Sequence, residues 1–165
     1  MSDWPAGQHL AEIYDALYAS LGEGARRASN DSFVVRLHEA SRAFGTLALE
    51  VRDDHEVSAD PLVSAMVGNS MAQDPTGALT LYALAMVLGP RLLVSLRDYL
   101  DDETNEDRRR ILAHGSDLVV REIRAVGETV ARCEPLDDPA WADAARSLVD
   151  VLDGAGMAES LGQRY

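Results

Sequence analysis

The sequence contains no lysine, although it carries 15 positive charges in 165 residues, all on arginine. This absence excludes chemistry that needs a side-chain amine, such as a Schiff-base lysine, a lysine general base or a P-loop lysine. Cysteine is nearly absent as well, since Cys133 is the only one and no internal disulfide can form. Cys133 lies among regularly spaced apolar residues, and a single cysteine in such a position is usually a small core residue. It gives no reason to expect an oxidising compartment.

Aromatic residues are also scarce, at 5%, whereas the hydrophobic fraction is 47%. The core must therefore consist mainly of leucine, valine, alanine and methionine, a composition that suits helices and disfavours a sandwich or barrel. A chain of 165 residues has the length of one domain and needs no disulfide or metal to fold. We expect one domain over residues 1–165, with a loosely held lead-in at 1–7 and tail at 156–165.

Acidic residues dominate the charge, with 28 acids against 15 arginines and a net charge of -13. Such a surface repels nucleic-acid phosphates and anionic lipid, and it favours metal ions or basic protein surfaces. The first residues lack the basic and apolar regions of a secretory signal peptide. We therefore expect no nucleic-acid partner, no membrane partner and a cytoplasmic location.

Two long stretches repeat their apolar residues at alternating spacings of four and three. The first stripe is Phe33, Leu37, Ala40, Phe44, Leu47 and Val51, and the second is Leu112, Val119, Ile123, Val126, Val130 and Cys133. This spacing places each set on one face of an α-helix, and helices of this kind pack side by side at shallow angles. The sequence therefore predicts an all-α fold, a bundle of five or six helices.

Capping signals divide the chain into elements. We expect helices at about 7–21, from the cap candidates at 29–32 to about 55, and at about 61–72, 75–100, 105–133 and 139–153. Gly22 and Gly24 are expected to end the first helix, because glycine disfavours helical conformation. Thr104 and Asp107 resemble a capping box that opens the helix at 105–133.

The predicted helix at about 75–100 is the most apolar part of the chain. Its run at 78–96 approaches the length of a transmembrane span, but Arg91 lies inside the run and acidic residues follow it. We therefore expect the central helix of a bundle. Pro90 cannot donate a backbone N–H and clashes with the preceding turn, so a kink or break is predicted there.

Two similar acidic clusters lie near the ends of two predicted helices. Their members are Glu50, Asp53 and Asp54 in one, and Asp98, Asp101 and Asp102 in the other. Carboxylates at this spacing share a helix face, and two such helix ends lying together would bind Mg²⁺. The clusters suit a Mg²⁺-dependent hydrolase or transferase acting on a nucleotide or prenyl diphosphate. They equally suit solvated helix ends neutralised by Arg52 and Arg97.

A second alternative is an apolar small-molecule sensor beside the predicted proline break. Met66, Met71 and Met86, with Tyr82 and Arg91 nearby, would line an apolar pocket with one polar anchor. Ordinary core packing is the simpler explanation of the same residues.

The sequence contains none of the motifs that mark a catalytic site. The four histidines are scattered, no nucleophile motif occurs, and the basic run at 108–110 is interpreted as a solvated first helical turn. The amphipathic faces, by contrast, are well formed. They favour a non-catalytic helical module without a cofactor, which binds a protein or ligand and self-associates as a homo-oligomer.

Overall fold

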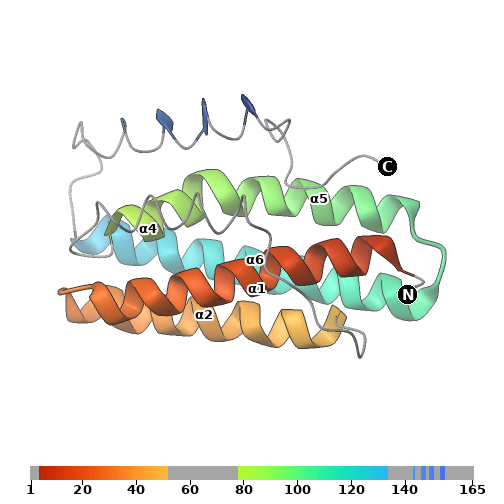
Figure 1. Ribbon diagram of the computed structural model, residues 1–165, viewed down its shortest axis with the longest axis horizontal. Coiled ribbons are helices and arrows are strands. Elements are labelled where there is room, and N and C mark those ends of the chain that lie inside the picture. The colour runs from red at the N-terminus through yellow and green to blue at the C-terminus, as the bar shows by residue number, and fades with distance from the viewer. Residues whose placement is uncertain are drawn as a thin grey trace. The chain divides into compact units, whose positions relative to one another are not determined.

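The computed structural model describes residues 4–51, residues 78–133 and seven positions between 143 and 154 (Figure 1). All secondary structure in these residues is helical, which confirms the all-α prediction. The elements are α1 (Pro5–Arg27), α2 (Asp31–Val51), α4 (Ala78–Ala83), the π-helix η1 (Leu84–Leu88), α5 (Gly89–Asp102) and α6 (Glu106–Cys133). The chain divides into two compact units, Met1–Gly77 and Ala78–Tyr165, called unit 1 and unit 2 below.

Some predicted elements lie outside the described residues. The predicted helix at 61–72 and the start of the helix at about 75–100 belong to this part of the chain. The seven described positions between 143 and 154 are helical; six of them fall within the predicted helix at 139–153, and the seventh, Gly154, lies one residue beyond its predicted end. The count of five or six helices and the single domain stay predictions.

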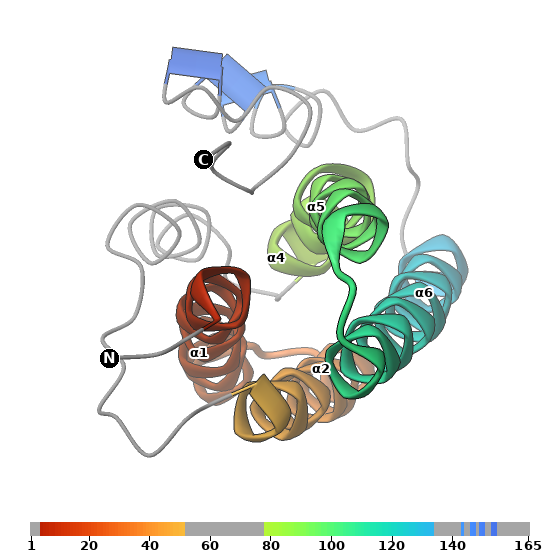
Figure 2. The same ribbon diagram turned by 90° about the vertical axis from the view of Figure 1, so that its right-hand side faces the viewer.

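In unit 1, α1 and α2 form an antiparallel helical hairpin (Figures 1 and 2). The first predicted stripe is confirmed as its core, since the following members are all buried: Phe33, Leu37, Ala40, Phe44, Leu47 and Val51. Tyr14 of α1 is buried against this stripe, with its ring centroid 6.2 Å from that of Phe44. The residues at 4-3 spacing thus form the buried face of α2, on which α1 packs.

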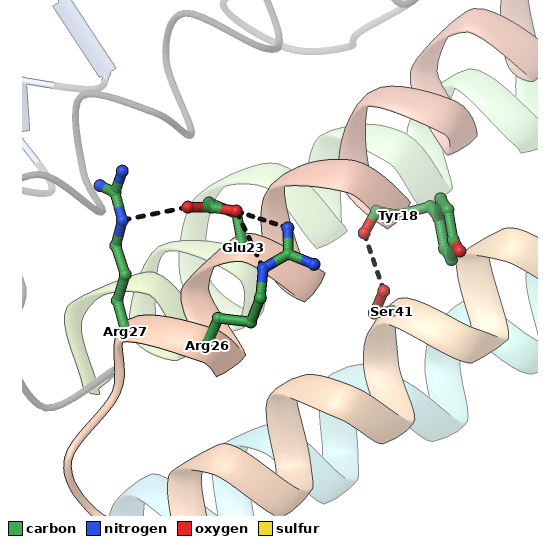
Figure 3. A network of polar contacts seen from close by, with 5 residues as sticks. All are labelled: Tyr18, Glu23, Arg26, Arg27 and Ser41. Carbon is green, nitrogen blue, oxygen red and sulfur yellow. Dashed lines mark hydrogen bonds and ion pairs between the residues drawn. The ribbon is translucent and has the colours of Figure 1, made fainter.

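Small residues bring the two helices of unit 1 close together. Ser41 Oγ donates a hydrogen bond of 2.7 Å to the backbone carbonyl of Tyr18 (Figure 3). A Cβ added to Gly22 would lie 3.3 Å from Ser41 Oγ, and one added to Gly45 would lie 2.9 Å from Cδ2 of Tyr18. The hairpin therefore depends on three positions at which a larger side chain would hold the helices apart.

The expected end of the first helix at Gly22 and Gly24 was wrong, because α1 continues to Arg27. Each glycine costs the helix about 1 kcal/mol relative to alanine. The packing of Gly22 on α2 and the pairing of Glu23 with Arg26 and Arg27 in the last turn offset this cost (Figure 3). Tertiary contact here prevails over local propensity.

The helix N-termini of the two units use the same capping residue type. Asn30 Oδ1 accepts the N–H of Phe33 at 3.2 Å, which confirms the cap predicted within 29–32. The capping box at Thr104 was wrong, because Asn105 caps α6 by accepting the N–H of Arg108 at 3.1 Å. Asparagine is the better cap, and it stands one residue further along the chain.

In unit 2, α4, η1 and α5 follow one another as a helical rod beside α6 (Figures 1 and 2). The second stripe is confirmed at Leu112, Val119, Val126 and Val130, which are buried, whereas Ile123 is half-buried. Helical conformation continues through Pro90, directly after the π-helical turn of η1. A π-helical turn changes the hydrogen-bond register, and Gly89 N–H there bonds to the Leu84 carbonyl. The kink itself stays a prediction.

Among the described residues, the stretch Thr80–Asp102 is the one helical segment long and apolar enough to cross a membrane. Its mean hydropathy reaches 1.3 over the most apolar window, of which 61% is buried within the protein. The buried core helix of a soluble protein has these same properties.

Gly89 provides a test of the packing in unit 2. An added Cβ would lie 2.6 Å from the Ile123 side chain and 2.6 Å from the Leu84 carbonyl oxygen. We expect Gly89→Ala to lower the free energy of unfolding by about 1–3 kcal/mol, as overpacking does. Urea denaturation followed by circular dichroism measures this change. Gly127→Ala is the matched control, since its Cβ meets nothing within 4 Å, and it should raise stability by about 0.5–1 kcal/mol. Equal effects of both variants would contradict the packing.

Tyr14 predicts how the stability of unit 1 responds to alkaline pH. Burial, with the Glu50 carboxylate as the smaller cause, raises the pKa of the Tyr14 hydroxyl above its ordinary value of 10.0. The folded state therefore holds this proton more tightly, and stability falls as pH rises past the unfolded pKa. Tyr14→Phe should lessen this alkaline loss in unfolding experiments between about pH 9 and pH 11. Tyr18→Phe, at an exposed ring, serves as the control, and an alkaline profile unaltered by Tyr14→Phe would refute the prediction.

Candidate functional site

The predicted metal-binding carboxylates fall on different units. Glu50 lies exposed in the last turn of α2, while Asp53 and Asp54 lie outside the described residues. Whether the two clusters share an ion therefore stays a prediction. Within the described ranges, no group of three or more histidine, cysteine or acidic residues is arranged to hold a metal ion.

The second acidic cluster lies at the end of α5. Asp98, Asp101 and Asp102 are all exposed, and Asp98 lies 3.8 Å from the guanidinium group of Arg97. This ion pair agrees with the alternative interpretation of the cluster as a solvated helix end with a neutralising arginine. Exposed pairs of this kind contribute little to stability.

Arg109 closes the carbonyl end of α5. Its Nη1 donates hydrogen bonds to the carbonyls of Leu100 at 2.6 Å and Glu103 at 2.8 Å. Arg109 is exposed in the first turn of α6, as the interpretation of the basic run at 108–110 expects, but its side chain also bonds to the end of α5, which the sequence did not indicate. Because the last carbonyls of a helix carry partial negative charge, the guanidinium group offsets the unfavourable acids of that turn.

The residues predicted to line an apolar pocket have different environments. Met66 and Met71 lie outside the described residues. Tyr82 is half-buried, and Met86 is 60% exposed. Arg91 Nη1 donates to the Val87 carbonyl of its own helix at 3.1 Å. The pocket stays a prediction. Of its described members, Met86 is exposed and Arg91 bonds within its own helix.

Unit 1 has a surface feature that the sequence reasoning missed. We call Tyr18, Val35 and Leu49 the apolar surface set, because they are large hydrophobic residues with exposed fractions of 49%, 56% and 70%. The ring of Tyr18 lies against α2 at Gly45, and Leu49 follows Gly45 by one helical turn. Tyr18 and Leu49 therefore lie on neighbouring turns of the same hairpin.

A signal for this surface exists in the sequence. Residues 35, 42 and 49 repeat at intervals of seven, which keeps them on one side of α2. This row of residues 35, 42 and 49 is offset by two residues from the buried stripe, and its middle residue, Arg42, is exposed and does not belong to the apolar surface set. A second heptad row with valine and leucine at its ends was thus available, although arginine in its middle weakens the pattern.

Models of known protein families, curated proteins and solved structures yield no match to this chain. The inference of function therefore starts from the exposed and buried residues of the chain itself.

The role of Arg109 at the end of α5 is testable by substitution. Arg109→Leu removes both hydrogen bonds to the terminal carbonyls, so we expect a loss of about 0.5–1.5 kcal/mol in the free energy of unfolding. Arg110→Leu is the control with the same change of charge. Its exposed pair with Asp107, at 3.6 Å, should contribute less than about 0.5 kcal/mol. If chemical denaturation gave the two variants the same stability, Arg109 would have no special role.

Proposed function

We propose that this protein is a non-catalytic helical binding module that self-associates through the apolar surface set of unit 1. The supporting observation is the exposure of Leu49 at 70% and of Tyr18 at 49%, one on each helix of the hairpin. Single exposed apolar residues are common on protein surfaces. Contiguous exposed apolar patches, by contrast, are typical of interaction sites.

The spacing along α2 suits a second copy of the chain as the partner. Most homodimers have a two-fold axis, and residues on opposite sides of that axis contact each other reciprocally. An antiparallel pairing of α2 about Arg42 would place each Val35 opposite the partner's Leu49, because both lie seven residues from Arg42. The same pairing would place the two Arg42 side chains at the axis, where their like charges lower the stability of the dimer.

Net charge predicts how this association depends on salt. Each copy carries a net charge of -13, so two copies repel each other at low ionic strength. Salt screens this repulsion over distances beyond about 10 Å at 0.1 M, while apolar contact is retained. Self-association through the apolar surface set should therefore strengthen as salt is added.

Two alternatives from the sequence remain proposals. Mg²⁺-dependent diphosphate chemistry requires the acidic ends of α2 and α5 to share an ion, and a sensor requires a pocket beside Pro90. The self-association proposal is compatible with a cytoplasmic bundle of five or six helices whose central helix bends at Pro90. It gains support from described surface residues, whereas both alternatives depend partly on residues 52–77.

Sedimentation equilibrium of the full chain tests the proposal. We expect a reversible dimer whose dissociation constant falls when salt is raised from about 0.05 to 0.5 M. Leu49→Glu should raise that constant by at least tenfold, because it places a charge in the apolar contact. Met86→Glu is the control, at another exposed hydrophobic residue, which lies in unit 2, and it should leave the constant unchanged. A wild type that stays monomeric, or a dimer that Leu49→Glu does not weaken, would refute the proposal.

A further inference from the structure

The link between α1 and α2 presents a serine that directly follows two arginines and one alanine. The sequence there reads Arg26-Arg27-Ala28-Ser29-Asn30, and residues 28–30 join the two helices. Ser29 is exposed, as are both arginines. A hydroxyl in an exposed link, preceded by paired positive charges, is the chemistry that serine kinases with an acidic peptide groove recognise.

The local structure allows this segment to enter such a groove. Arg26 and Arg27 pair with Glu23, but exposed ion pairs of this kind are weak and exchange with other acidic partners. Arg26 and Arg27 are the last two residues of α1 and bury no side chain, whereas Gly24 and Ala25 before them are buried, so only the end of the helix frays at small cost. Residues 26–30 can then extend while the packed turns of α1 stay in place.

We propose that Ser29 is a phosphorylation site for an ATP-dependent serine kinase that selects arginine two and three residues before its target. In this reaction Ser29 Oγ forms a bond to the γ-phosphorus of ATP, and the bond from that phosphorus to the bridging oxygen of ADP breaks. The hydroxyl proton passes to the base of the kinase, and ADP leaves. This proposal does not depend on self-association.

The folded chain also accommodates the product. Phosphoserine at position 29 would directly precede Asn30, the cap of α2, so its negative charge would lie near the positive end of that helix. Arg26 and Arg27, in the last turn of α1, supply guanidinium groups for the phosphate oxygens, in competition with Glu23. Phosphorylation should therefore stabilise the link between the two helices.

The test uses the full chain, ATP and a purified serine kinase of this arginine-directed class, with intact and peptide mass spectrometry as the readout. We expect one phosphate, located on Ser29, and none at that position in Ser29→Ala. The double variant Arg26→Gln/Arg27→Gln should lower kcat/KM for phosphorylation at least tenfold. Arg121→Gln/Arg124→Gln on α6, with the same change of charge, and Ser32→Ala, at the next exposed serine, should both match the wild type.

Two results would overturn the proposal. A synthetic peptide of residues 24–33 that accepts phosphate while the folded chain does not would show that the fold withholds Ser29. Phosphate on another residue of the folded chain, with Ser29 unmodified, would show that the kinase selects a different site and would also overturn the proposal. Thermal unfolding adds a second readout, since the phosphorylated chain should unfold about 2–4 °C higher at low salt, and a lower midpoint would contradict the placement beside the α2 N-terminus.

Discussion

The close approach of α1 and α2 is the constraint on which unit 1 depends. Gly22, Ser41 and Gly45 leave so little space between the helices that Ser41 can donate a hydrogen bond to a carbonyl of the neighbouring helix. Gly45 also lies beside the partly exposed ring of Tyr18, so a Cβ at position 45 would meet that ring. One member of the apolar surface set for which we propose a binding role thus lies against the packed hairpin.

Unit 2 also has a small residue at a close helix contact, directly before its proline. Gly89 allows Ile123 of α6 to pack directly onto the helix that contains Pro90. The π-helical turn of η1 precedes this contact, and helical conformation continues to Asp102. Arg109 then donates hydrogen bonds to the carbonyls at the end of α5. The acidic residues of that turn lie in solvent beside these hydrogen-bonded carbonyls.

The failed sequence predictions share one cause. Gly22 and Gly24 were expected to end a helix, and Thr104 to cap one, because these residues were judged by local preference. Propensities of about 1 kcal/mol or less are easily exceeded by a packed interface, as at Gly22, or by a better capping residue one position away, as at Asn105. The row of residues 35, 42 and 49 on α2 is hard to recognise for another reason, because its periodicity is weaker than that of the buried stripe beside it.

The amino-acid sequence by itself determined the all-α class, the two apolar stripes and a helix cap within residues 29–32, because helix periodicity and capping depend on residues within a few positions of each other. Only the tertiary structure decided where α1 ends, how the chain passes Pro90, that Arg109 caps α5 and that Tyr18 is exposed. Each of these depends on an atom supplied from another turn or another helix, such as the Leu84 carbonyl, the side chain of Ile123 or the missing Cβ of Gly45. Some of these contacts join residues far apart in the chain, such as Gly89 and Ile123, and others connect two successive helices, such as Arg109 and Leu100, so the periodicity within one helix does not encode them.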